Sequence, residues 1–392
     1  LTAFATLLFD FEWAIYGAAM VGLFVGVIIG IVTDFFTNDE KRPVRNVAKA
    51  SESGPAFTIL SGVSYGFLSI LPAMIGIAIS ALVAYKLGAL IDPNLTNEYG
   101  MFGISMAAVG MLSIVGMIIS NDAYGPIVDN ARGLAEMGNL GEDVVEITDS
   151  LDSAGNTVKA VTKGFAIGAA GLTVIALLGA FVSEANAHII DLRGPAAELI
   201  KAFDIMNPIV FFGMIIGAAV PAVFSALLML GVGRNAQRMV SEIHRQFEEI
   251  VGLKEGEEGV EADYGKCIEI ATEGALKELI PAGLFAILLT IVVGFVGGIH
   301  AIGGYLAGNI VSGLLLALFM SNSGGLWDNS KKFVESGHNG GKGSDAHKAA
   351  VIGDTVGDPF KDTAGPSINT QITVVSLVAS LLSGLFVLFS IF

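Results

Sequence analysis

The sequence predicts an all-α membrane protein: a polytopic helical bundle with about eight transmembrane helices, forming one transmembrane domain over residues 1–392. Composition is the first reason, because 53% of the residues are hydrophobic and only 15% are charged, where a soluble domain carries about 25%. The second is a series of apolar runs of about 20 residues, the length that crosses a bilayer. The third is glycine at 50 positions, which suits close helix packing in lipid.

The apolar runs are separated by polar segments, and none of them alternates as a barrel strand would. The sixth and seventh runs are almost contiguous, which predicts a tight helical hairpin. The eight runs lie near 13–34, 57–87, 101–120, 164–183, 207–232, 279–300, 302–320 and 367–391.

Charge predicts the orientation of these spans. Eighteen of the 21 basic residues fall in four of the segments between the runs. Because basic loops stay on the cytoplasmic side, these segments should be cytoplasmic and both ends of the chain external. The four predicted cytoplasmic loops are 35–56, 121–163, 233–278 and 321–366.

Several function classes are excluded or disfavoured. A net charge of −16 argues against nucleic acid, and any phosphate ligand would need a divalent metal as intermediary. The lone Cys267 excludes a disulfide framework and a cysteine metal cluster. The glycine-rich stretch 340–344 fails as a phosphate-binding loop, because glycine follows its lysine and no strand precedes it.

The most informative motif is GDTVGDPFKDT at 353–363. On a regular helix its four charged residues fall at i, i+4, i+7 and i+8, so they share one face. Clustered carboxylates repel one another unless a cation binds them, and Mg²⁺ bridges carboxylates to phosphate. The motif predicts a metal–phosphate site built on Asp354, Asp358, Lys361 and Asp362.

Three other segments carry charged or polar residues at helical spacing, at the predicted cytoplasmic ends of spans. A solvated loop with ion pairs explains any single one of them, but less easily their repetition on one side. The pairs or triplets are Asp122 with Asp129, Asn156 with Lys159 and Lys163, and Asp328 with Lys331 or Lys332.

These stretches together resemble the membrane-bound, ion-pumping inorganic pyrophosphatases. The similar segments are DAYGPIVDNARGLAEM (122–137), LDSAGNTVKAVTKGFAIG (151–168), GGLWDNSKKFVE (324–335) and KGSDAHKAAVIGDTVGDPFKDTAGPSIN (342–369). The resemblance implies hydrolysis of Mg-pyrophosphate to two phosphates by direct attack of water, coupled to ion pumping, with Mg²⁺ as the cofactor.

The resemblance also assigns roles by position. Metal ligands would be Asp129, Asp328, Asp354 and Asp358. Phosphate contacts would come from Lys331, Lys361 and Asn156. Asp362 would orient the attacking water, and Asn369 would lie on the ion path. Lys159 and Thr162 match the K⁺-independent members, which are typically proton pumps and in which the lysine ammonium takes the place of potassium.

Two positions depart from the family pattern: Arg132 stands where glycine is usual, and Thr373 where many members have a lysine. The similarity covers only the second half of a full member, and a further aspartate-rich motif of the first half is not found here. The expectation is therefore that an N-terminal half, in the same chain or a separate one, completes the site. The resemblance also implies a homodimer embedded in membrane lipid.

Two alternatives use the same carboxylates. One is a secondary transporter or channel with ion-coupling sites, although such sites usually lie near the middle of the bilayer. The other is a partner subunit with no catalytic activity of its own.

Overall fold

The structure is a computed structural model that describes residues 2–257 and 259–392. The side chains described are those of all these residues except Thr2, Ala5, Asp122, Asn156, Thr157, Lys159 and Ala160.

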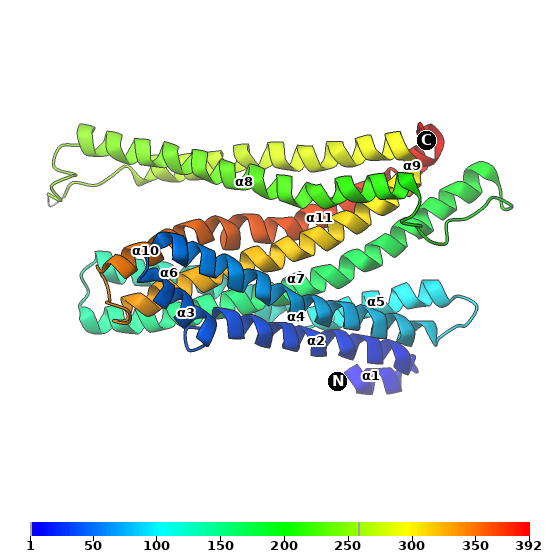
Figure 1. The fold of residues 1–392 in the computed structure, drawn as a ribbon, viewed down its shortest axis with the longest axis horizontal. Coiled ribbons are helices and arrows are strands. Elements are labelled where there is room, and N and C mark those ends of the chain that lie inside the picture. The colour runs from blue at the N-terminus through cyan, green and yellow to red at the C-terminus, as the bar shows by residue number, and fades with distance from the viewer. Residues whose placement is uncertain (1, 258) are drawn as a thin grey trace.

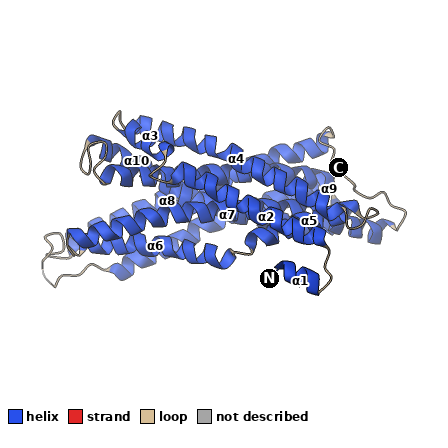
Figure 2. Ribbon diagram, turned by 90° about the horizontal axis from the view of Figure 1, so that it is seen from below, coloured by secondary structure: helices blue, strands red, loops and turns tan. Residues whose placement is uncertain are grey.

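The described chain is helical, without strands, and its long helices run roughly along one axis (Figures 1 and 2). This confirms the predicted all-α class. The elements in order are α1 (Thr2–Leu8), α2 (Trp13–Thr37), α3 (Arg42–Ser51), α4 (Pro55–Ala89), α5 (Thr96–Leu112), α6 (Val115–Met137), α7 (Glu142–Arg193), α8 (Pro208–Glu249), α9 (Tyr264–Glu335), α10 (Asp345–Asp358), the π-helical turn η1 (Pro359–Ala364), α11 (Gly365–Leu381) and α12 (Ser383–Phe389).

Five of the described helices are individually long and apolar enough to cross a membrane, and two bent pairs raise the number to seven. The bent pairs are α5 with α6, and the stretch from α10 to α11 with α12. Helix α9 is 72 residues long and contains both the sixth and the seventh predicted spans. Counting its two limbs separately brings the total into line with the eight expected.

The hairpin within α9 turns at Gly298, whose φ of 62° and ψ of −161° break the helix. A positive φ costs glycine little, so this residue type suits the reversal. Figure 1 shows the chain reversing its direction within α9, close to the C-terminus. The end of the chain pairs with the turn: the Ile391 N–H donates to the Phe295 carbonyl at 2.9 Å.

Much of the polar sequence between the predicted spans is helical. Helix α7 begins at Glu142, α8 continues to Glu249, and the second limb of α9 continues to Glu335. Asparagine, aspartate and serine caps mark where several of these helices begin. At α10, for example, the Ser344 hydroxyl accepts from the His347 N–H at 3.1 Å, a bond that contributes about 1 kcal/mol.

Close backbone contact at glycines holds the bundle together, because lipid supplies no hydrophobic force between helices. A Cβ on Gly22 of α2 would lie 1.9 Å from the Ala107 carbonyl oxygen of α5. The same value separates a Cβ on Gly213 of α8 from the Ala301 carbonyl oxygen of α9. Any side chain at either glycine would force these helix pairs apart.

A small apolar cluster lies beside the polar end of α9 and consists of Val44, Val47, Leu326 and Trp327. The indole N–H of the fully buried Trp327 donates to the Thr58 carbonyl at 3.0 Å. This bond joins α9 to α4 and fixes the turn of α9 that precedes Asp328.

Candidate metal and phosphate site

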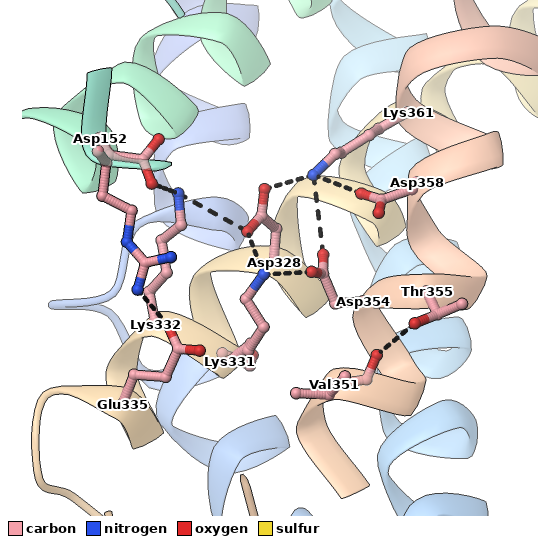
Figure 3. Close-up of polar contacts among 12 residues, drawn as sticks. Asp152, Asp328, Lys331, Lys332, Glu335, Val351, Asp354, Thr355, Asp358 and Lys361 are labelled. Atoms are coloured by element: carbon pink, nitrogen blue, oxygen red, sulfur yellow. Dashed lines mark hydrogen bonds and ion pairs between the residues drawn. The ribbon is translucent and has the colours of Figure 1, made fainter. Parts of the chain in front are cut away.

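Three of the predicted metal-binding carboxylates meet at one end of the bundle. Asp328 comes from α9, and Asp354 and Asp358 come from α10. One carboxylate oxygen from each lies within 4.8 Å of the others, and Figure 3 shows all three directed at the same small volume. Asp328 and Asp354 are buried, whereas the side chain of Asp358 is 53% exposed, so the site opens on that side.

Two glycines allow the helices that carry these carboxylates to touch. A Cβ on Gly324 of α9 would lie 2.7 Å from the Gly357 carbonyl oxygen and 2.5 Å from the Lys361 Cβ. A Cβ on Gly357 would lie 2.9 Å from the Trp327 ring. Hence Asp328, one turn after Gly324, comes within reach of the aspartates that flank Gly357.

The chain after Asp358 is not the regular helix that the sequence predicted. Pro359 has no backbone N–H to donate, and residues 359–364 form a π-helical turn, a feature often found at functional sites. The wider turn directs the side chains of its two charged residues, Lys361 and Asp362, to different surroundings. The Lys361 side chain is directed inward and is 10% exposed, whereas that of Asp362 is 48% exposed.

The ammonium group of Lys361 lies among the carboxylates. It donates a hydrogen bond to Asp328 Oδ2, and lies 3.0 Å from Asp358 Oδ1 and 3.8 Å from Asp354 Oδ1. Its distance to Asp362 Oδ2 is 4.0 Å. The four charged residues of the 353–363 motif therefore do gather, but around a lysine supplied by the π-helical turn.

Lys331 pairs with the other buried carboxylate. Its ammonium group donates to Asp354 Oδ2 and lies 3.7 Å from Asp328 Oδ1. Asp354 Oδ1 is buried and has no hydrogen-bond donor. A buried carboxylate oxygen that accepts no hydrogen bond is costly, and hard oxygen ligands are those that Mg²⁺ prefers. The donor set formed by Asp328, Asp354 and Asp358 therefore fits Mg²⁺.

Asp362 is turned toward α7. The Lys163 ammonium group donates to Asp362 Oδ1 at 2.9 Å and to the Lys361 carbonyl at 2.6 Å. The helical spacing places Lys163 on the face of Asn156 and Lys159 but predicts no role for it. It links α7 to the turn that carries both Lys361 and Asp362.

Sequence reasoning missed one buried ion pair beside the site. The Lys332 ammonium group donates to Asp152 Oδ2 and lies 3.8 Å from Asp328 Oδ1 (Figure 3). Asp152 is 1% exposed, and this burial raises its pKa, which Lys332 opposes. A usable signal was present, since Asp152 lies one helical turn before Asn156, on the face already under consideration.

The other predicted site residues are not placed in this group by the structure. Asp129 is exposed on α6 and is not one of the three carboxylates that meet. Thr162 is buried and donates to the Val158 carbonyl at 3.0 Å. The side chains of Asn156 and Lys159 lie outside the described residues. Asn369 lies on α11, and its Oδ1 is buried without a hydrogen-bond donor.

The two residues that depart from the family pattern, Arg132 and Thr373, both have polar partners. Arg132 joins three helices, because its guanidinium pairs with Asp149 at 2.6 Å, Glu136 at 3.2 Å and Glu335 at 3.6 Å. Thr373 makes a hydrogen bond within α11, donating to the Asn369 carbonyl at 3.0 Å.

Comparison with known proteins agrees with the geometry. Residues 1–382 match the family model described as inorganic H⁺ pyrophosphatase. A K⁺-insensitive pyrophosphate-energized proton pump of Methanosarcina mazei is 45% identical over 369 residues, which are 94% of this chain and 52% of that protein. A proton pump of the same name from Caldanaerobacter subterraneus is 42% identical over 372 residues, which are 95% of this chain and 51% of that protein.

A protein of Bacteroides thetaiotaomicron, provisionally named a K⁺-stimulated pyrophosphate-energized sodium pump, is 43% identical over 393 residues. Those residues make up 96% of this chain and 53% of that protein. The chain thus spans about half the length of the curated relatives it matches, and these relatives differ in both the ion and the K⁺ response.

Proposed function

Because the chain belongs to the family of inorganic H⁺ pyrophosphatases, we propose that it carries the hydrolytic site of a pump that splits Mg-pyrophosphate and transports protons across a membrane. The observation that supports this proposal best is the meeting of Asp328, Asp354 and Asp358 with two lysines at the end of a bundle of membrane-spanning helices. The names of the relatives favour this reading over a secondary transporter, since each names a pyrophosphate-driven pump.

The three carboxylates would hold Mg²⁺ between them and the phosphate groups. When bound, Mg²⁺ neutralises charge on the phosphate oxygens and on the leaving phosphate. Asp358 would be the first of the three that an entering ion meets, because its side chain is half-exposed while the other two are buried.

The lysines would exchange partners when substrate binds. Lys331 and Lys361 have ammonium groups directed into the same volume as the carboxylates (Figure 3). Metal bound to those carboxylates would leave both ammonium groups available to phosphate oxygens. Charge-assisted hydrogen bonds of this kind are shorter and stronger than neutral ones.

Hydrolysis would proceed by attack of water on one phosphorus, breaking the bridging P–O bond and giving two phosphates. Asp362 would orient the water and accept its proton, since its carboxylate lies beside Lys361 and is partly exposed. The proton would then leave toward Asn369 on α11, about two helical turns after Asp362 in the chain. Coupling would run through this helix, whose first residue directly follows the π-helical turn.

The proposal includes the type and setting of the pump. Lys159 and Thr162 support the K⁺-insensitive, proton-transporting type. The end of the bundle that carries the site would face the cytoplasm, and the protein would act as a homodimer in the lipid bilayer. Asp129 and Asn156 would complete the metal and phosphate contacts.

An Asp358→Asn substitution tests the site. It removes one charge from the metal ligands but leaves the buried Asp328 and Asp354 in place, so we expect loss of nearly all Mg²⁺-dependent phosphate release from pyrophosphate. The measurement is phosphate release by the full-length protein in membrane vesicles. An Asp345→Asn variant is the control, because Asp345 is an exposed residue at the far end of α10 and pairs with Lys348. Near-normal turnover by Asp358→Asn would contradict the proposal.

A further inference from the structure

We infer that Asp152 is a positioning residue that holds the Lys332 ammonium group away from Asp328 and so keeps one Asp328 oxygen available to metal. The inference rests on the proposed function of the carboxylate group. It assigns a role to a buried ion pair that takes no direct part in the proposed reaction.

The contacts of Asp328 are unequal at its two oxygens. Oδ2 accepts a hydrogen bond from Lys361. Oδ1 lies 3.7 Å from the Lys331 ammonium group and 3.8 Å from that of Lys332. Both distances exceed a hydrogen bond. Two ammonium groups therefore lie near Oδ1 of Asp328, but neither donates a hydrogen bond to it.

Each of those two lysines is held back by another carboxylate. Lys331 donates to Asp354, which belongs to the metal-binding group. Lys332 donates to Asp152 on α7, which does not. Metal bound to Asp354 would release Lys331, whereas Lys332 would keep its partner. Asp152 thus differs from the three carboxylates of the metal-binding group in that it would retain its lysine while the site is loaded.

The geometry of α9 makes Lys332 a competitor if this partner is lost. Lys332 follows Asp328 by four residues, so the two side chains lie on the same helix face. Among the described residues, Asp328 and Asp152 are the carboxylates within 4.0 Å of the Lys332 ammonium group. Without Asp152, a cation whose side chain is 12% exposed would be left beside Asp328 alone.

A purely structural ion pair between α7 and α9 makes a different prediction. Removal of either partner would then damage the site in the same direction, because both leave a buried charge unpaired. A positioning role predicts opposite directions. Losing Asp152 places a cation on the metal ligand, and losing Lys332 removes that cation.

The experiment measures Mn²⁺ binding to the full-length protein in detergent, without substrate, by electron paramagnetic resonance. We expect Asp152→Asn to weaken Mn²⁺ binding by about tenfold, the scale on which residues behind metal ligands act. Lys332→Met should bind Mn²⁺ at least as tightly as the parent, and the double variant should return close to the parent value. Ser153→Ala is the matched control: it removes a 3.0 Å hydrogen bond from α7 to Asp39 without changing charge.

The possible results separate this inference from the proposed function. Unchanged binding in Asp152→Asn, or weakened binding in both single variants without recovery in the double variant, would overturn the positioning role alone. Failure of the parent to bind Mn²⁺, or binding that Asp358→Asn leaves unaltered, would overturn the metal site and the inference with it. If Asp152→Asn does not fold, Lys332→Met and the double variant still test the inference. Both must then bind Mn²⁺ at least as tightly as the parent, and weaker binding by either would contradict the positioning role.

Discussion

Every cation near Asp328 is matched to a carboxylate. Lys361 pairs with Asp328 itself, Lys331 with Asp354, and Lys332 with Asp152. Isolated buried charges would each cost several kcal/mol, and pairing offsets that cost. The lysines therefore stabilise the acidic group in the absence of metal, and in the proposed function the ammonium groups of Lys331 and Lys361 would meet phosphate once metal takes their carboxylates.

Lys159 carries the prediction on potassium. In the proposed reading its ammonium group supplies the positive charge that K⁺ provides in other members of the family. Pyrophosphate hydrolysis by the parent should therefore be the same with and without K⁺, whereas Lys159→Ala should be slow without K⁺ and stimulated by it. Phosphate release measured at constant ionic strength, with Na⁺ replacing K⁺, checks both. Strong activation of the parent by K⁺ would count against the assignment.

The crossing of α9 and α10 is the contact between helices on which the site depends. A Cβ at Gly324 would lie 2.5 Å from the Lys361 Cβ and 2.7 Å from the Gly357 carbonyl oxygen, and backbone cannot yield as a flexible side chain can. We expect Gly324→Ala to displace the π-helical turn and to lower both Mn²⁺ binding and hydrolysis by at least about tenfold, since small displacements near a reacting group are costly.

Gly283 provides the control for that substitution. It lies in the first limb of the same helix, and a Cβ there would have no atom within 4 Å. Gly283→Ala should therefore leave metal binding and hydrolysis near the parent values, although both substitutions make the same chemical change. Equal behaviour of the two alanine variants would contradict the importance of the crossing.

The sequence predicted the helical spans better than the turns and contacts that join them. Apolar length alone located the spans, including the hairpin at Gly298, because a span is set by local composition. The π-helical turn was not predicted, since a proline inside a helical pattern is equally compatible with a kink or an end. The Asp152–Lys332 pair was missed for another reason: its two residues are 180 positions apart, and only packing of α7 on α9 brings them together.

In the candidate site too, the sequence predicted proximity within one helix but not proximity that depends on helix packing. Asp354, Asp358 and Lys361 lie on consecutive turns, so their proximity followed from spacing. Their meeting with Asp328 needed the glycine contact between helices, which spacing does not express. Asp129 shows the converse, since its motif was recognised but its carboxylate is exposed on α6, apart from the three that meet.

Across the whole molecule, the four basic segments lie toward one end. Lys342 pairs with Glu136, Asp152 with Lys332, and Ser153 donates to Asp39, so three of the four basic segments are in mutual contact there. The remaining basic segment follows α8, and Figure 1 places its loop toward the same end. This arrangement agrees with a single side for all four, as the positive-inside rule requires.

Labelling from the two sides of the membrane tests that orientation. Helix α8 has 42 residues, and at about 1.5 Å per residue it is longer than the ~30 Å hydrocarbon layer, so the loops at its two ends should lie on opposite sides. In a Cys267→Ser background, the exposed Glu255 after α8 and the exposed Glu198 before it offer one cysteine site each. An impermeant maleimide should label Glu255→Cys only from the cytoplasmic face and Glu198→Cys only from the other. The reverse pattern would place the carboxylate site on the opposite side of the membrane. The site would then have no access to cytoplasmic pyrophosphate, and the proposed function would be contradicted.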